Sequence, residues 1–192
     1  MSRRVAIYLT HPEVAIDPAV PVPDWGLTPV GTERVAAAAG RLPEGPVHVV
    51  TSAERKALET AWPFGARAGV PVEVRAAMHE NDRSATGYLP PDRFEEARLA
   101  FFGAPEVSFR GWERAVDAQV RILAEVRAVL AEQAAPVIFC GHGGVGALLL
   151  AGLQGAPISL DWDRGGGGHW FSFDAVSEEV LSDWQPIERL FV

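Results

Sequence analysis

The chain has 192 residues, of which 48% are hydrophobic and 22% charged, a balance that fits one folded domain spanning residues 1–192 and excludes a disordered or fibrous protein. The net charge of -8 argues against a general nucleic-acid or anionic-membrane surface, because phosphate backbones are bound through an excess of Lys and Arg. The single cysteine, Cys140, excludes an internal disulfide and a cysteine-cluster metal site, and its apolar surroundings predict a buried thiol.

The first predicted element is a buried strand over residues 5–9, which ends at Thr10 and His11. In open α/β sheets ligands bind at the carboxyl ends of strands, so His11 is a candidate for chemistry. Three prolines then predict an irregular loop over residues 14–27, and a loop of that length in a compact domain is usually functional, serving as a lid or an interface.

A helix is predicted over residues 32–42, with Thr28 as a plausible N-cap and Pro29 at the first helical position. A short strand over residues 47–50 precedes a second helix, capped by Ser52 and starting near Ala53. Arg55 and Lys56 fall in its first turns. Cations there oppose the helix dipole, which hints at a nearby anion, although solvated surface charges explain them equally well.

Pro63 is expected to kink or end this helix. A third strand over residues 72–74 leads into a polar turn containing Glu80 and Arg83, and a short helix follows over residues 94–102. The region of about residues 80–112 carries no recognisable motif. We interpret it as a cap that selects the substrate.

The last third alternates helices and strands. Its predicted elements are a helix over 112–133, a strand over 137–140, a helix over 147–153 and a closing hairpin near 169–184. Alternating strands and helices predict a three-layer α/β/α sandwich with a mostly parallel central sheet.

His142 follows the strand over 137–140 as His11 follows the first strand, so a parallel sheet would bring both to one edge. The same edge would receive Arg55 and Lys56, with Glu80 and Arg83 from a neighbouring loop. A nucleophilic imidazole, cations and a carboxylic acid are the groups that phosphoryl transfer through a phosphohistidine requires.

Four motifs, in this order along the chain, resemble those of the histidine phosphatase superfamily, the phosphoglycerate-mutase-like proteins. They are Thr10-His11-Pro12-Glu13, Leu27-Thr28-Pro29-Val30-Gly31, the segment Ser52 to Ala61, and Gly141-His142-Gly143-Gly144. The resemblance implies a phosphoglycerate-mutase-like fold and a metal-independent phosphomonoester hydrolase without a cofactor.

By this resemblance His11 is the phosphorylated nucleophile, Glu80 the proton donor and His142 a pocket histidine that donates to the phosphoryl oxygens. The resemblance further implies phosphate or substrate contacts, which we assign to Thr10, Arg55, Lys56, Arg83, Gly143 and His169.

Two positions depart from the family pattern. Thr10 stands where the family has its first arginine and Lys56 where it has the second, so two guanidinium forks are missing. Losing one preorganised oxyanion donor typically costs about 2.7–4 kcal/mol, which predicts a weak phosphatase. We expect Arg55 or Arg83 to compensate by pointing into the pocket. The alternative is an impaired pseudophosphatase that binds a phosphorylated ligand.

Other classes of protein fit less well. Gly141 to Gly146 matches a dinucleotide-binding glycine pattern with Asp161 at the expected spacing, but it lies too near the end of the sequence. A zinc site from His11, Glu13, His142 and His169 lacks any metal-binding spacing. No G-x-S-x-G motif supports a serine hydrolase.

The expected partner is a small phosphorylated substrate, with no nucleic acid, and a homodimer remains open. The sequence contains no run of eighteen uncharged apolar residues, so no membrane helix is predicted. No apolar stretch long enough for a signal peptide precedes His11, so a cytoplasmic protein is expected. Most of the six tryptophans fit core or loop anchors, but Trp25 and Trp112 are candidates for a substrate entrance.

Overall fold

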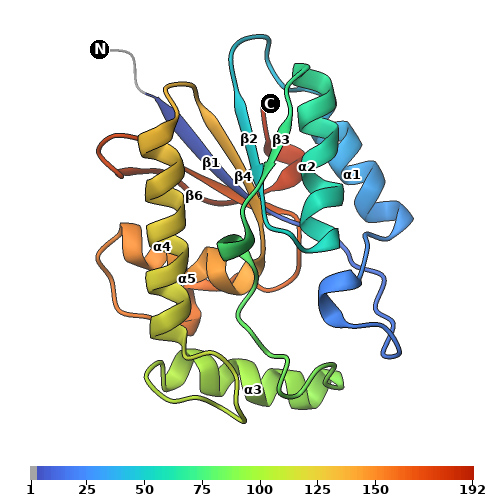
Figure 1. Cartoon of the computed structure of the whole chain (residues 1–192), viewed down its shortest axis with the longest axis vertical. Coiled ribbons are helices and arrows are strands. Elements are labelled where there is room, and N and C mark those ends of the chain that lie inside the picture. Colours follow the sequence, from blue (N-terminus) through green and yellow to red (C-terminus); the bar gives the residue numbers. More distant parts are fainter. Residues whose placement is uncertain (1–3) are drawn as a thin grey trace.

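The computed structural model describes residues 4–192, which form a six-stranded sheet with helices on both faces (Figure 1). The strand order is β3-β2-β4-β1-β5-β6. The strands are β1 (Val5–Thr10), β2 (His48–Thr51), β3 (Val72–Val74), β4 (Val137–Gly141), β5 (His169–Asp174) and β6 (Val180–Pro186). β1 to β4 are parallel, and the hairpin β5–β6 joins β1 antiparallel.

Five α-helices pack against this sheet. They are α1 (Pro29–Gly40), α2 (Arg55–Ala68), α3 (Pro91–Gly103), α4 (Ala115–Glu132) and α5 (Gly143–Leu153). Successive side chains of β4 point to opposite faces: Ile138 and Cys140 enter the core under α1 and α2, and Val137 and Phe139 enter the core under α4 and α5. The three-layer α/β/α prediction is therefore confirmed.

Helix α2 continues past Pro63 to Ala68, so Pro63 does not end it. The proline removes one backbone donor, but Ala61 and Phe64 on either side of it are completely buried in the core. That packing outweighs the local cost. The helix also begins at Arg55, with Glu54 rather than Ser52 as its N-cap residue, whereas the predicted Thr28 cap of α1 is confirmed by its bond from the Gly31 N–H at 3.0 Å.

Helix α3 lies across the end of the sheet at which the parallel strands finish (Figure 1). The loop over residues 14–27 reaches the same end of the sheet. Its first and last residues, Val14 and Leu27, pair with each other in an isolated antiparallel β-bridge. The space between α3, this loop and the strand ends is the site described below.

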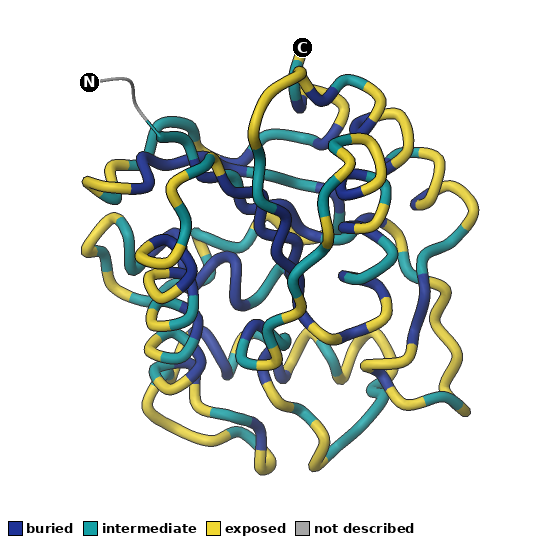
Figure 2. Tube along the Cα trace, turned by 45° about the horizontal axis from the view of Figure 1, so that its top comes forward, coloured by how far each residue is buried: buried dark blue, intermediate teal, exposed yellow. Residues whose placement is uncertain are grey.

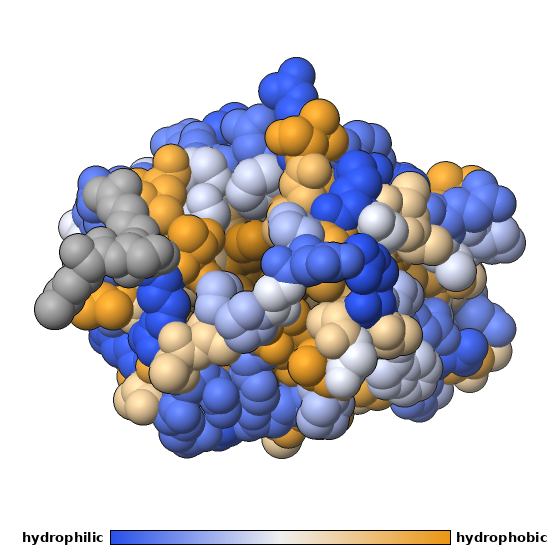
Figure 3. Space-filling view, turned by 90° about the horizontal axis from the view of Figure 1, so that it is seen from above, coloured by the Kyte–Doolittle hydropathy of each residue, from blue (hydrophilic) through white to orange (hydrophobic). Residues whose placement is uncertain are grey.

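Burial follows the layers: in Figure 2 the strands and the inner turns of the helices are buried and the outer turns are exposed. Figure 3 shows the end of the molecule opposite α3, where charged and apolar side chains are interspersed. Within residues 4–192, no helix combines the length and the apolar character needed to cross a membrane.

Candidate active site

His11 leaves the end of β1 as a candidate nucleophile. Its backbone N–H still donates to the Gly141 carbonyl at 3.0 Å, and its ring Nδ1 lies 2.9 Å from the Pro12 carbonyl. A carbonyl oxygen only accepts, so Nδ1 carries the proton and Nε2 keeps its lone pair. Burial lowers the pKa of His11 to about 4, which leaves the imidazole neutral at neutral pH.

Glycine makes this placement of His11 feasible. A Cβ at Gly167 would lie 2.4 Å from the His11 carbonyl oxygen, a separation that no side chain tolerates. The Gly168 N–H donates to that same carbonyl at 2.9 Å. The glycine run over residues 165–168 therefore holds the backbone of the His11 loop against the start of β5.

His142 lies behind His11, with ring centroids 5.4 Å apart and an angle of 69° between the ring planes. Its side chain is fully buried and does not line the cavity. The hydroxyl of Ser52 lies 2.8 Å from its Nε2 and also accepts the Glu54 N–H, so the hydroxyl proton is available for Nε2. In that arrangement Nδ1 carries the ring proton, and Nδ1 has no acceptor among the described residues.

Burial lowers the pKa of His142 well below its ordinary value, so this second imidazole is also neutral at neutral pH.

Glu54 is a site residue that the sequence did not reveal. Its carboxylate is buried and forms an ion pair with Lys56, and it accepts the Glu80 N–H at 2.8 Å. Burial by itself raises the pKa of Glu54, but the charge and hydrogen bond of Lys56 and the hydrogen bond from the Glu80 N–H outweigh it and hold that pKa below its ordinary value. Lys56 also donates to the Val22 carbonyl at 3.0 Å, so its charge is already neutralised within the protein.

Glu80 lines the cavity and caps the N-terminus of α5. Its Oε1 accepts the Asn81 and Val145 N–H groups at 3.1 and 3.0 Å, whereas Oε2 accepts only the Gly144 N–H at 3.2 Å. A Cβ at Gly144 would lie 2.9 Å from Oε1, so glycine is needed for this close approach. Burial raises the pKa of Glu80, which favours a protonated carboxyl, and Oε2 is the oxygen best placed to hold the proton.

Arg121 of α4 positions the Glu80 loop from outside the cavity. Its guanidinium donates to the carbonyls of Ala77 and His79 at 2.7 and 3.0 Å and forms an ion pair with Glu113. Two parts of the chain far apart in sequence, residues 77–79 and residues 113–121, meet in this contact. Only the tertiary structure assigns this role to Arg121.

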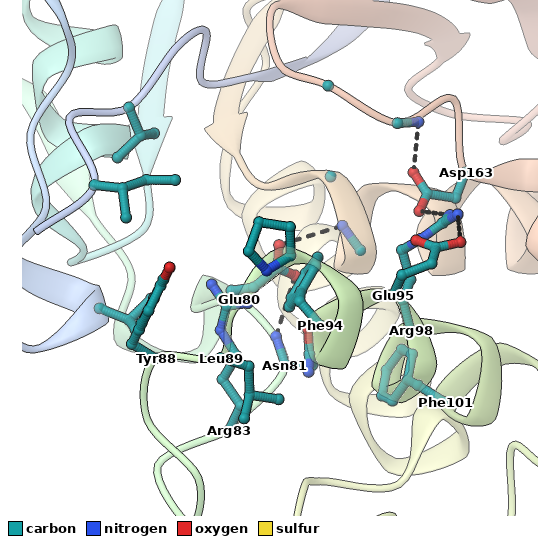
Figure 4. Close-up of a pocket in the computed structure, with 18 of the residues that line it drawn as sticks. Glu80, Asn81, Arg83, Tyr88, Leu89, Phe94, Glu95, Arg98, Phe101 and Asp163 are labelled. Atoms are coloured by element: carbon teal, nitrogen blue, oxygen red, sulfur yellow. Dashed lines mark hydrogen bonds and ion pairs between the residues drawn. The ribbon is translucent and has the colours of Figure 1, made fainter. Parts of the chain in front are cut away.

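The two arginines expected to compensate lie in different places. Arg83 lines the cavity, extends toward Glu80 (Figure 4), and has its guanidinium carbon 4.9 Å from the centre of the Phe94 ring. No carboxylate within residues 4–192 forms an ion pair with Arg83. Arg55 is 62% exposed, forms an ion pair with Glu59 at 2.7 Å and does not line the cavity. The assignment of Arg55 to phosphate binding is therefore corrected.

Thr10, to which phosphate binding was also assigned, does not line the main cavity. Its hydroxyl donates to the His169 carbonyl at 3.2 Å and accepts the His169 N–H at 2.9 Å. The single O–H proton is thus used within the sheet and is not available to a phosphate. Thr10 and His169 border only a small hollow beside the main cavity, whereas Gly143 lines both spaces.

The main cavity has a volume of about 550 Å³ and reaches from His11 to α3. Figure 4 shows its floor at Glu80 and Asn81 and its outer wall at Tyr88, Leu89 and Phe94. The amide Nδ2 of Asn81 is buried and has no hydrogen-bond partner among residues 4–192. Asn81 is a cavity residue that sequence reasoning missed.

Two alternative interpretations conflict with this geometry. A dinucleotide would place its pyrophosphate at the N-terminus of α5, but the Glu80 carboxylate already occupies the Gly144 and Val145 N–H groups. Of the supposed zinc ligands, Glu13 forms an ion pair with Arg34 at 2.7 Å. Throughout residues 4–192, no three His, Cys, Asp or Glu side chains are grouped to hold a metal ion.

Comparison with known proteins identifies the family of this chain. The family model of the histidine phosphatase superfamily (branch 1) matches residues 18–169. The chain belongs to the histidine phosphatase superfamily. The match begins after the His11 motif.

Relatives within the superfamily are named phosphatases. The chain is 32% identical over 176 residues to glucosyl-3-phosphoglycerate phosphatase of Mycolicibacterium vanbaalenii, covering 85% of this chain and 78% of that protein. This relationship supports phosphatase activity for the chain.

Solved structures show the shared fold. A mycobacterial glucosyl-3-phosphoglycerate phosphatase superposes with a TM-score of 0.76 at 24% identity, covering 96% of this chain and 97% of that one. Phosphoserine phosphatase of Entamoeba histolytica, solved with 3-phosphoglyceric acid, superposes with a TM-score of 0.77 at 13% identity, covering 98% and 99%. The expected phosphoglycerate-mutase-like fold is confirmed.

Proposed function

We propose that the protein hydrolyses phosphate monoesters without a metal ion, through a phosphohistidine on His11. The observation that carries the proposal is a neutral histidine whose unprotonated Nε2 lies at a cavity that also contains a carboxyl with a raised pKa. The first group is a nucleophile and the second an acid.

The reaction has two steps. Nε2 of His11 attacks phosphorus, the N–P bond forms, and the ester P–O bond breaks while Glu80 gives its proton to the leaving alcohol oxygen. The Glu80 carboxylate then removes a proton from water, whose oxygen attacks phosphorus and displaces His11. The products are an alcohol and inorganic phosphate, and Glu80 is protonated again.

Arg83 and Asn81 line the cavity and are suited to hold the phosphoryl oxygens. Within residues 4–192, Arg83 has no carboxylate partner and the buried Asn81 Nδ2 has no acceptor. His142 Nδ1 also lacks an acceptor there, but His142 lies behind His11 and does not line the cavity. A buried donor left unpaired costs about 1–3 kcal/mol, so a phosphoryl oxygen beside His11 would relieve that cost. Lys56 contributes only if its pairing with Glu54 loosens.

Metal removal and trapping test the mechanism together. We expect hydrolysis of p-nitrophenyl phosphate to proceed undiminished in EDTA at mildly acidic and neutral pH. A rapid quench with alkali should capture a phosphorylated protein whose phosphate is lost in acid, as phosphoramidate bonds are. Activity that disappears with EDTA and returns with a divalent metal would contradict the proposal.

Glu54 offers an explanation of weak activity, because its carboxylate competes with phosphate for Lys56. We expect Glu54→Gln to bind inorganic phosphate at least about tenfold more tightly, a gain of roughly 1.4 kcal/mol. The amide removes the negative charge but keeps an oxygen for the Glu80 N–H. Isothermal titration calorimetry measures the change.

The matched control for Glu54→Gln is Glu59→Gln, on the same helix but paired with Arg55 outside the cavity. It should bind phosphate as the wild type does. Equal phosphate affinity in all three proteins would show that Glu54 does not oppose the anion.

A second candidate function is phospholigand binding without turnover. The favouring observation is that Thr10 uses its hydroxyl on β5 and Lys56 is neutralised by Glu54, so neither replaces the family arginines. In that case calorimetry would detect binding of phosphate, and no p-nitrophenol would be released.

A further inference from the structure

The cavity extends well beyond the space that a phosphoryl group needs. Its volume of about 550 Å³ is in the range that holds a small organic ligand. The excess space lies between the loop over residues 14–27 and α3, away from His11. Whatever alcohol the phosphate is attached to must occupy this part.

The wall of this outer part is apolar and aromatic. Trp25 from the loop and Tyr88 meet edge to face with ring centroids 6.0 Å apart, and Phe94 lies 6.2 Å from Trp112. All four side chains line the cavity. The two tryptophans singled out as entrance candidates are therefore parts of this wall.

The indole N–H groups of the two tryptophans are bound within the protein, and the Tyr88 hydroxyl is the one polar group of this aromatic wall that faces the open space (Figure 4). Trp25 donates its indole N–H to the carbonyls of Asp17 and Val20 at 2.9 and 3.0 Å, and Trp112 donates to Thr86 at 2.9 Å. A sugar would bring several hydroxyl groups to a surface that has few free partners for them.

The charges of the cavity also select against an anionic alcohol. Arg98, at the far end, is bound by Glu95 at 2.7 Å and Asp163 at 2.8 Å (Figure 4), and Lys56 is bound by Glu54. Within the described chain, Arg83 is the one cavity cation without a carboxylate partner. The phosphate group itself needs that charge, so none is left for a second anion.

We propose that the substrate is a phosphate monoester of an uncharged alcohol that carries a bulky apolar group, and this inference rests on the proposed function. It differs from the substrate in the name of the curated relative, glucosyl-3-phosphoglycerate, which combines a sugar and a carboxylate. The apolar group would lie against Phe94 and Tyr88 while the phosphate meets His11.

Three esters of primary alcohols test the preference: 2-phenylethyl phosphate, glycerol 1-phosphate and 3-phosphoglycerate. Their leaving oxygens are similar, so differences reflect binding of the alcohol. We expect wild-type kcat/KM for 2-phenylethyl phosphate to exceed the other two values by at least about tenfold, within the range that one apolar pocket supplies. Equal or higher values for glycerol 1-phosphate or 3-phosphoglycerate would overturn the inference.

Binding to His11→Ala separates this inference from the proposed function, because that variant cannot form the phosphohistidine. Calorimetry should show that His11→Ala binds 2-phenylethyl phosphate at least about tenfold more tightly than glycerol 1-phosphate or 3-phosphoglycerate, in the absence of turnover. If wild type hydrolyses nothing but His11→Ala keeps the order, the proposed function fails and the ligand preference stands. If hydrolysis occurs without that order of affinities, the preference fails alone.

Two substitutions on α3 locate the effect. Phe94→Ala should reduce the preference for 2-phenylethyl phosphate over glycerol 1-phosphate by at least about fivefold, because it removes an aromatic wall. Leu99→Ala changes an exposed residue of the same helix and should leave the preference unchanged. Tyr88→Ala, in the loop before α3, gives the same test if Phe94→Ala does not fold. A preference unchanged in both aromatic variants would contradict the proposal.

Discussion

His11→Ala is expected to abolish phosphatase activity, lowering kcat for p-nitrophenyl phosphate by at least about a thousandfold. The substitution removes the only atom proposed to bond to phosphorus, and alanine offers no replacement. Two measurements check this: kcat for p-nitrophenyl phosphate, which should fall, and the alkaline quench, which should trap no phosphorylated protein. Both follow from the free Nε2 of His11 at the cavity.

The fold should survive this substitution. The side chain of His11 hydrogen-bonds locally, to the Pro12 carbonyl, so we expect a change in the free energy of unfolding of about 1 kcal/mol or less. His48→Ala is the matched control, since His48 binds Glu73 at the far end of β2 and should leave activity intact. Activity retained in His11→Ala would place the nucleophile elsewhere.

Glu80→Gln is expected to lower the hydrolysis of alkyl phosphates by about a hundred- to ten-thousandfold, the usual contribution of a general acid. An alkoxide leaves poorly unless it receives a proton, and an amide cannot supply one. The first step with p-nitrophenyl phosphate should slow much less, because p-nitrophenolate is a stable anion that leaves without a proton, whereas the later attack of water loses its base with either ester. The measurement is the pre-steady-state rate at which each alcohol is released, variant against wild type.

The pH profile gives a second signature of Glu80. Its acid form is the active one and its pKa is raised, so the wild-type rate on alkyl esters should fall as pH rises through that pKa. On the acid side the rate should fall only as pH approaches about 4, where His11 becomes protonated. The alkaline fall should be absent in Glu80→Gln.

Two results would separate chemistry from structure in this variant. Glutamine keeps one oxygen to accept the N–H groups at the start of α5, so thermal unfolding should remain close to that of wild type. Glu96→Gln, an exposed change on α3, should leave both rates unaltered. Equal losses on alkyl and aryl esters would indicate that Glu80 holds the site together rather than donating a proton.

Most of the fold and the location of the site were predictable from local pattern. Buried strands that end at His11 and His142, separated by amphipathic helices, specify a parallel sheet with both histidines at one edge. The order of the four motifs predicted the superfamily, because the short segments with glycine and histidine at strand ends can be recognised in the sequence alone. The interpretation of residues 80–112 as a cap that selects the substrate stays a prediction, since apolar residues there fit core or pocket equally well.

The sequence by itself therefore determined the layers of the sheet, the edge at which His11 and His142 meet and the candidate nucleophile. Only the tertiary structure decided that Arg83 enters the cavity while Arg55 does not, because that choice depends on Glu59 one turn away and on the packing of Phe94. It also decided that Glu54 neutralises Lys56. Side-chain direction and charge pairing depend on contacts between distant segments, which periodicity and spacing do not encode.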